Sequence, residues 1–309
     1  LKGIFDKEIE INNLSKIFYD IEIPMINVLS QMEAEGIKID TSYLKKLDKE
    51  FEDDLEKLKK EIFKKCGEEF NLNSPKQLGE ILFDKLKLVS KPKKTKTGQY
   101  STSEEVLSSL ANDHKIIENI LEWRSLDKLQ NTYVKSLPNE VSRLTNRVHS
   151  SFNQTVTTTG RLSSNNPNLQ NIPIRTSNGQ KIRKAFIPRN NDYILMAADY
   201  SQIELRVIAS LSNEENMIDA FTKNQDIHTM TASKIYDVTP ENVTRHQRGN
   251  AKTVNFGIIY GVSAFGLSQQ TDLNRSESKD MIDNYFLNYP GLKKYMSDQI
   301  DFARNNGYV

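Results

Sequence analysis

The sequence contains a single cysteine, Cys66, in 309 residues. One cysteine can form neither an internal disulfide nor a cysteine-built metal centre, so both are excluded within the chain. A chain with so little cysteine suits a reducing compartment, and we expect the cytoplasm. The first ten residues, LKGIFDKEIE, lack the charged-then-apolar order of a secretory signal peptide.

Long apolar runs and an excess of one charge are also missing. No apolar stretch approaches the ~20 residues that a membrane-spanning helix needs, so we expect no membrane partner. The 42 basic residues are balanced by 41 acidic residues, and this total gives no sign of a strong polyanion binder. In contrast, 13 Phe and 12 Tyr are too many for a disordered chain, and the length suits two or three substructures with packed cores.

The first part of the chain has apolar residues at helical spacing, separated by recognisable helix caps. Pairs such as Asp40-Thr41 and Ser74-Pro75 are typical of helix starts. Helices are predicted at 14–35, at about 42–65, within 71–86, at about 103–112 and at 114–137. This region is therefore expected to be almost entirely helical.

The middle of the chain has a different pattern. Residues 141–160 contain segments in which apolar and polar residues alternate, and they are rich in Thr and Val. Both features favour strands. A compact apolar run at 193–198 predicts a buried strand with Asp199 at its end, where a rigid sheet could hold a functional carboxylate. A lone carboxylate in such a place is more often a cap or an ion-pair partner. Helical patterns return after Leu205, and this order indicates an α+β fold.

A second motif lies in the C-terminal part, in RGNAKTVNFGIIYG at 248–261. Arg248, Lys252, Phe256 and Tyr260 are each four residues apart, so a helix would carry them along one face. Two cations and two flat rings in one stripe suit a triphosphate, a sugar and a base. An ordinary amphipathic helix with exposed cations is the simpler alternative.

Several segments together resemble DNA polymerase family A, the family of bacterial DNA polymerase I. DYSQIELR at 199–206 is similar to its motif A, and the R-x3-K-x7-Y-G pattern within 248–261 is similar to motif B of the fingers helix. TTTGRLSSNNPNLQNIP at 157–173 resembles the primer–template segment, and EWRSLDKLQNTY at 122–133 resembles a thumb helix. The resemblance runs nearly end to end in the family's order.

The resemblance implies a two-metal centre for nucleotidyl transfer. Asp199 would bind both catalytic Mg²⁺ ions, and Tyr200 would contribute its backbone carbonyl. Arg248 and Lys252 would hold the triphosphate and neutralise the charge that develops on it. Phosphoryl transfer depends on charge placement more than on covalent help, so it needs no cysteine or histidine cluster.

The same resemblance implies further contacts to the nucleotide. His228 in DIHT would reach toward the phosphates, and Gln202 would also bind the nucleotide. Phe256 would lie against the incoming sugar, where phenylalanine is expected to disfavour dideoxynucleotides. Glu204 would obstruct a ribose 2′-hydroxyl and pair with Tyr260, which would stand beside the templating base. Without the resemblance, an isolated histidine is more often structural.

Primer–template DNA and a dNTP are the implied partners, bound by a chain that we expect to be a monomer. The implied DNA contacts are Arg124 and Lys128 on the duplex, and Arg161, Asn168, Gln170 and Arg175 near the growing primer end. Polar side chains suit the minor groove because every base pair presents similar acceptors there. On local grounds alone, Asn168 and Gln170 would be turn formers, and Arg124 would be a solvated or ion-paired residue.

One family motif is missing. The string His-Asp-Glu, whose Asp would be the second magnesium ligand, does not occur in the 309 residues. We therefore expect a fragment of a longer polymerase that cannot extend a primer by itself. Residues 1–13 could be the end of a preceding exonuclease-like domain.

The predicted architecture is mostly helical α+β, arranged as a right-hand polymerase with an antiparallel palm sheet. We predict a palm-entry helix at 1–33, a thumb at 34–137, a partial palm at 138–206 and fingers at 207–309. The implied function of the parent protein is template-directed DNA synthesis in replication and repair. The alternatives are a non-catalytic DNA-binding module and a nucleotidyl transferase like the single-subunit RNA polymerases; Glu204 and Phe256 argue against the latter.

Overall fold

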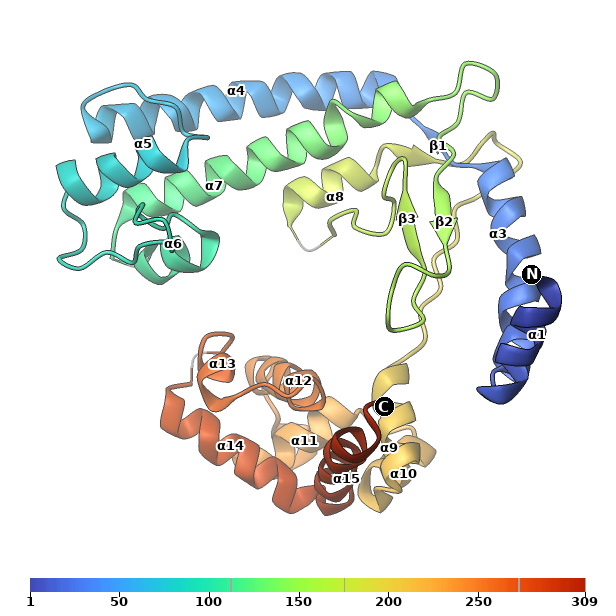
Figure 1. The fold of residues 1–309 in the computed structure, drawn as a ribbon. Helices are drawn as coiled ribbons and strands as arrows, with labels where there is room; N and C mark the ends of the chain where they lie inside the picture. The colour runs from blue at the N-terminus through green and yellow to red at the C-terminus, as the bar shows by residue number, and fades with distance from the viewer. Residues whose placement is uncertain (112, 175, 272, 309) are drawn as a thin grey trace. The chain divides into compact units, whose positions relative to one another are not determined.

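The computed structural model describes residues 1–111, 113–174, 176–271 and 273–308. The chain folds into two compact units, Leu1–Met196 and Ala197–Val309. Helices dominate both units and the described strands are short, so the mostly helical α+β prediction is confirmed (Figure 1).

The first unit consists of helices joined by loops and short strands. Its α-helices are α1 (Lys2–Ile11), α2 (Ser15–Ile17), α3 (Ile23–Glu35), α4 (Thr41–Cys66), α5 (Pro75–Gly79), α6 (Glu104–Ala111), α7 (Lys115–Leu129) and α8 (Ser177–Arg183). Short π-helical segments continue three of these runs, at Phe18–Glu22, Glu80–Lys85 and Gln130–Val134. The helices predicted in this region are therefore confirmed, with Asn112 lying outside the described residues.

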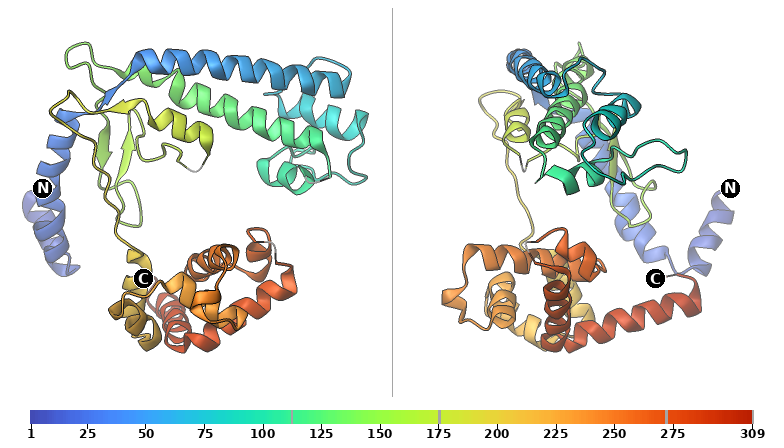
Figure 2. Two further views of the ribbon diagram at one scale, coloured as in Figure 1. Left: turned by 180° about the vertical axis from the view of Figure 1, so that it is seen from behind. Right: turned by 90° about the vertical axis from the view of Figure 1, so that its left-hand side faces the viewer.

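Helices α4 and α7 lie side by side and contribute much of the core of this unit (Figures 1 and 2). α4 starts where predicted because the Asp40 carboxylate accepts a 2.8 Å hydrogen bond from the Tyr43 N–H. It ends at Gly67, whose φ of 73° suits glycine. The buried apolar residues of the two helices are Leu44, Leu47, Phe51, Leu55, Ile62 and Cys66 on α4, and Ile116, Ile117, Ile120, Trp123 and Leu126 on α7. Burying each such side chain stabilises the fold by roughly 1.5–3 kcal/mol.

The strands of the first unit form short antiparallel pairs. β1 (Lys38–Ile39) pairs with β4 (Phe186–Ile187), and β2 (Ser151–Asn153) pairs with β3 (Ser163–Asn165). Of the strands predicted within 141–160, the structure forms the short β2. Thr and Val favour extended backbone, but a strand extends only as far as a partner pairs with it.

The prediction of a buried strand at 193–198 is wrong. These residues form no strand, and Ile194 and Met196 are 86% and 84% exposed. An apolar segment becomes a buried strand only when another strand pairs with its backbone, and none of the described residues does so here. Asp199 therefore follows an exposed segment without regular secondary structure, and not the end of a buried sheet strand as predicted.

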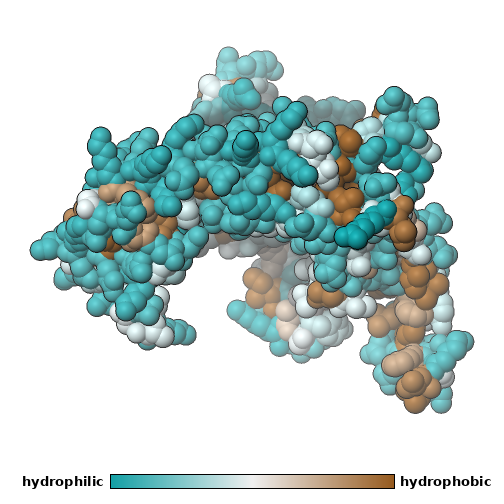
Figure 3. Space-filling view, turned by 90° about the horizontal axis from the view of Figure 1, so that it is seen from above, coloured by the Kyte–Doolittle hydropathy of each residue, from teal (hydrophilic) through white to brown (hydrophobic). Residues whose placement is uncertain are grey.

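The N-terminal helices expose much of their apolar surface. Ile26 and Val28 of α3 are 50% and 51% exposed. Among the described residues of this helix, only Leu29 is buried. Figure 3 shows apolar residues along these helices in brown. Among the described helices, none has the combined length and apolar character required to cross a membrane.

In its described residues the second unit consists of helices joined by turns and loops and contains no strand, as predicted. Its α-helices are α9 (Ile203–Ser212), α10 (Glu215–Thr222), α11 (Ile227–Tyr236), α12 (Arg245–Ile259), α13 (Ala264–Ser268), α14 (Arg275–Asn288) and α15 (Pro290–Asn306). Its core includes Leu205, Met217, Val254 and Tyr285, which bring α9, α10, α12 and α14 together. Polar side chains, among them Thr231 and Asn255, are also buried in this unit.

Candidate functional site

A cavity of about 410 Å³ in the second unit brings together most of the residues that motifs A and B predict. It lies between residues 199–204, α11 and α12. The predicted residues that line it are Asp199, Tyr200, Gln202, Glu204, His228, Arg248, Lys252 and Phe256. Tyr260 is the exception, because it caps the C-terminus of α12 and does not line this cavity.

The wall from motif A depends on an unusual backbone conformation at Gln202. Gln202 has a φ of 53° in the turn before α9, which begins at the next residue. This conformation is uncommon for a residue other than glycine. The Oε1 atom of Gln202 is buried and has no hydrogen-bond partner among the described residues. Gln202 therefore belongs to the cavity wall and has a side-chain acceptor that is shielded from solvent and unsatisfied.

The wall from motif B is a helical stripe on α12. Thr244 starts this helix through a capping box: its hydroxyl accepts a 3.2 Å hydrogen bond from the Gln247 N–H, and its own N–H donates a 2.9 Å bond to Oε1 of Gln247. Arg248, Lys252 and Phe256 follow at one-turn intervals and all line the cavity. The helix therefore places two cations and a ring side by side, as the spacing predicts.

Arg248 is held by a carboxylate at the start of α11. Its Nε donates to Oδ2 of Asp226 at 2.5 Å, and Asp226 also accepts hydrogen bonds from the N–H of His228 at 3.1 Å and the hydroxyl of Thr229 at 2.8 Å. Burial acts to raise the pKa of Asp226, but the hydrogen bonds from Arg248 and Thr229 outweigh it and lower the pKa. Asp226 is therefore ionised at neutral pH, and the terminal guanidinium nitrogens of Arg248 remain as further donors.

His228 is a buried and uncharged wall of the same cavity. It is 3% exposed, and its Nδ1 lies 2.9 Å from Nδ2 of Asn255. Burial lowers the pKa of His228 to about 4; Asp226 opposes this shift, and Arg248 and Lys252 add to it. The ring is therefore neutral at pH 7 and cannot act as a cation there.

Asp199 and Tyr200 are the residues predicted to hold magnesium. Both are exposed and both line the cavity, so the Asp199 carboxylate offers the hard oxygen ligand that Mg²⁺ favours. Within the described residues, no group of three or more His, Cys, Asp and Glu could hold a metal ion. The donor set thus fits an ion that takes its remaining ligands from phosphate oxygens and water.

Arg124 and Lys128 lie one turn apart on α7 and line a second cavity of about 360 Å³ in the first unit. Arg124 donates to the backbone oxygen of Thr102 at 2.6 Å, and burial lowers its pKa without removing its charge. Lys128 is exposed. Arg124 therefore has a hydrogen-bonding role within the first unit. Its role on DNA stays a prediction.

The predicted primer–template residues lie around the β2–β3 hairpin. Oδ1 of Asn168 accepts bonds from Ser164 Oγ at 3.0 Å and the Gln170 N–H at 2.9 Å, so this side chain forms a turn. Gln170 and Arg161 are exposed. The remaining predicted contact, Arg175, lies outside the described residues.

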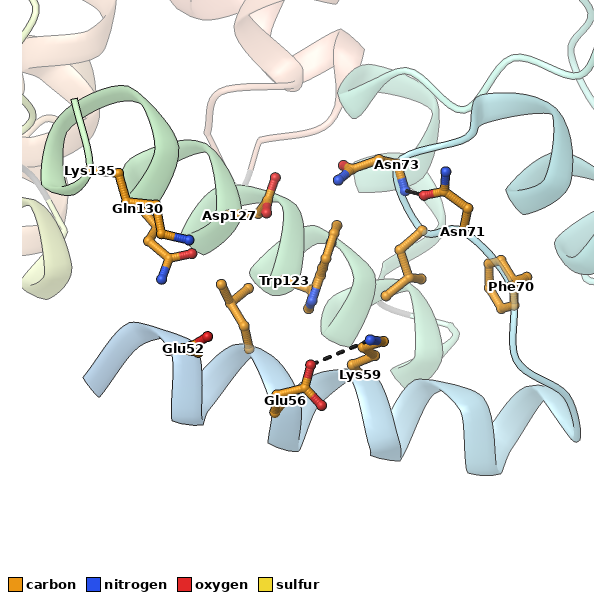
Figure 4. A pocket seen from close by; sticks show the side chains of 12 residues that line it. Glu52, Glu56, Lys59, Phe70, Asn71, Asn73, Trp123, Asp127, Gln130 and Lys135 are labelled. Carbon is orange, nitrogen blue, oxygen red and sulfur yellow. Dashed lines mark hydrogen bonds and ion pairs between the residues drawn. The ribbon is translucent and has the colours of Figure 1, made fainter. Parts of the chain in front are cut away.

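A third cavity, between α4 and α7, contains none of the predicted residues. Figure 4 shows it with the ion pair between Glu56 and Lys59, whose atoms are 3.4 Å apart. Glu52 and Asp127 add two more carboxylates to its lining. Lys59 and Lys135 also line this cavity, so three carboxylates face two lysines and the cavity has no excess of positive charge for a phosphate backbone.

Some residues of the site carry no separate signal in the predicted set. Ser201 and Ile203 line the cavity and belong to the DYSQIELR segment, so the motif itself was the available signal. Asp226 was missed although it stands two residues before His228, where an Asp is a typical N-cap. Its bond to Arg248 has no local signal, because the two residues belong to different helices.

Most of the chain matches one protein family. The profile described as DNA polymerase family A matches residues 41–309. DNA polymerase I of Geobacillus stearothermophilus is 48% identical over 302 residues, which are 98% of this chain and 34% of the relative. The thermostable DNA polymerase I of Thermus thermophilus is 47% identical over 293 residues, which are 95% of this chain and 35% of the relative. The chain thus spans about a third of the length of these relatives.

A solved structure is similar over nearly the whole chain. It is the POL domain of Pol1 from M. smegmatis in complex with DNA primer-template and dNTP. The TM-score is 0.89 at 39% sequence identity, and the match covers 98% of this chain and 53% of the solved chain.

Proposed function

Because the chain belongs to DNA polymerase family A, we propose that it forms the nucleotide- and DNA-binding part of a template-directed DNA polymerase. In this reaction the primer 3′-oxygen attacks the α-phosphorus of a dNTP, a new P–O bond forms, and the bond to pyrophosphate breaks. The observation that carries the proposal is the cavity that Asp199 shares with Arg248 and Lys252. A carboxylate and two cations in one cavity suit a metal-bound triphosphate.

The proposed residues each contact a different part of the nucleotide. Arg248 and Lys252 bind phosphate oxygens and neutralise the charge that moves onto pyrophosphate as it leaves. Phe256 packs against the sugar, and Glu204 blocks the position that a ribose 2′-hydroxyl would occupy. Tyr260, at the end of α12, stands beside the templating base.

Magnesium is the ion that the donor atoms suit. Asp199 and the carbonyl of Tyr200 would hold it together with phosphate oxygens. When bound, it supplies positive charge that lowers the pKa of the primer 3′-hydroxyl and stabilises the leaving pyrophosphate. Two ions would need a further carboxylate, so we expect the 309-residue chain not to extend a primer on its own.

The DNA contacts belong to the first unit. Arg124 and Lys128 bind the duplex in a thumb at 34–137, while Arg161, Asn168, Gln170 and Arg175 bind near the primer end in a palm at 138–206. These side chains contact phosphates and minor-groove acceptors, which do not depend on sequence. An enzyme that copies any template needs contacts of this kind. We place the protein in the cytoplasm with the chromosome.

Isothermal titration of a dNTP and Mg²⁺ into the chain tests the proposal. Lys252→Ala should weaken binding about tenfold or more, because a hydrogen bond to a charged group contributes roughly 1.5–3 kcal/mol. Lys279→Ala is the matched control, since Lys279 is an exposed lysine on α14 and does not line the cavity. Equal affinities in all three proteins would contradict the proposal and favour a DNA-binding module that needs no nucleotide.

A further inference from the structure

A chain of hydrogen-bonded side chains crosses the core of the second unit and ends at the cavity. The hydroxyl of Tyr289 lies 3.2 Å from Oγ1 of Thr231, and that hydroxyl donates to Oδ1 of Asn255 at 3.1 Å. Nδ2 of Asn255 lies 2.9 Å from Nδ1 of His228. All four residues are at most 3% exposed, and His228 is the member that lines the cavity.

The proton of each hydrogen bond in this series can be assigned in turn. Thr231 has a single hydroxyl proton and uses it on Asn255, so Tyr289 must be the donor of the first bond. Because Oδ1 of Asn255 accepts, its amide nitrogen is the donor to His228. Nδ1 of His228 is therefore an acceptor. A neutral imidazole carries one N–H, which must then be on Nε2.

Burial keeps the ring neutral. Desolvation is the largest cause of the lowered pKa of His228, about 4, and Arg248 and Lys252 contribute in the same direction against Asp226. Lys234 also lies near these hydrogen-bonded residues, with its Nζ 5.0 Å from the centre of the Tyr289 ring. A third cation beside Arg248 and Lys252 would be repelled by them, whereas an uncharged N–H donor is not.

We propose that Thr231 and Asn255 are positioning residues that fix His228 as the Nε2–H tautomer, so that its ring presents one uncharged donor to a phosphate oxygen. The ligand in this inference rests on the proposed nucleotide site; the tautomer does not. Neither Thr231 nor Asn255 lines the cavity, so both act through His228. Arg248 and Lys252 then supply charge, and His228 supplies a bond of fixed direction.

Nuclear magnetic resonance of the chain labelled with ¹⁵N-histidine tests the tautomer without any nucleotide. His228→Gln identifies the ring signals among the four histidines. The expected spectrum has an unprotonated Nδ1 and a protonated Nε2, unchanged from about pH 8 to about pH 5.5 because the pKa is about 4. A proton on Nδ1 at pH 7 would overturn the inference, whether or not the chain binds a dNTP.

Two variants test the positioning residues. In Asn255→Asp the carboxylate can only accept, so Nδ1 of His228 should become protonated. Asn250→Asp is the matched control, because Asn250 lies on the same helix and bonds the hydroxyl of Tyr236 at 3.2 Å. It should leave the ring signals of His228 unchanged.

Thr231→Val removes the hydroxyl that orients the Asn255 amide. The ring should then populate both tautomers, and dNTP affinity should fall about threefold to tenfold. Thr253→Val is the control, since Thr253 bonds the backbone of Gly249 at 3.3 Å. A purely structural role for Thr231 predicts a lower melting temperature with unchanged His228 signals, and that result would overturn its assignment.

Discussion

Asp226 accepts a hydrogen bond from Nε of Arg248 at 2.5 Å, and this ion pair joins the start of α11 to the first turn of α12. The same carboxylate bonds the backbone N–H of His228 at 3.1 Å. One acidic side chain therefore places two proposed nucleotide contacts relative to each other. Its charge also offsets that of Arg248 before a triphosphate binds.

The Asp226–Arg248 pair predicts a specific pH dependence of stability. The folded-state pKa of Asp226 is lower than its ordinary value of 3.8, so its ionisation stabilises the fold above that pH. This contribution is lost as the pH falls through the lower, folded-state pKa. Since the pair is partly exposed, we expect Asp226→Asn to cost up to about 1 kcal/mol at pH 7.

Urea denaturation from pH 7 to pH 3, followed by circular dichroism, measures this difference. The stabilities of wild type and Asp226→Asn should converge at the acidic end. Asp283→Asn, which changes an exposed carboxylate on α14, should follow the wild type throughout. A gap between wild type and Asp226→Asn that widens on acidification would contradict the assigned direction of the pKa shift.

Glu204 predicts the sugar specificity of the site. Replacing it by alanine should remove the proposed obstruction to a 2′-hydroxyl, so the preference for dATP over ATP in a binding titration should fall about tenfold or more. Glu241→Ala, on an exposed glutamate away from the cavity, should keep the wild-type preference. An unchanged preference in Glu204→Ala would exclude this role.

Phe51 predicts a large loss of stability in the first unit. Its side chain is 0% exposed in the core shared by α4 and α7, so Phe51→Ala should cost about 3–5 kcal/mol. Fluorescence of Trp123, the sole tryptophan of the sequence, reports unfolding of this unit. Phe302→Ala, at a 40% exposed position on α15, should leave the Trp123 transition in place.

Cys66 should be unreactive in the folded chain. It is 2% exposed, and burial raises its pKa from 9.0 to about 11. Lys85 lowers this pKa and Glu68 raises it, both by less than burial does. The thiolate is the reactive form, so a shift of this size lowers its population at pH 8 about 100-fold. A colorimetric thiol reagent should therefore react slowly before denaturation and rapidly after it. Rapid reaction with the native chain would show that the site opens or that the shift is absent.

Local sequence determined the helices and the order of side chains along them. Asp40 caps α4 and Thr244 caps α12, and both caps act within four residues of themselves, so they can be recognised without any tertiary structure. The same is true of Arg248, Lys252 and Phe256, because the helical period alone puts residues four apart on one face. The family resemblance then supplied the chemistry expected of that face.

Tertiary structure decided which distant side chains meet and which strands form. The cavity brings Asp199 to α12, and the buried core joins His228 to Asn255; both pairs depend on the packing of separate segments. The apolar run at 193–198 shows the converse, because its composition favours a strand but its backbone finds no partner among the described residues. Helical hydrogen bonds are made within a segment, whereas strand pairing and buried polar contacts require a second segment whose position no local pattern encodes.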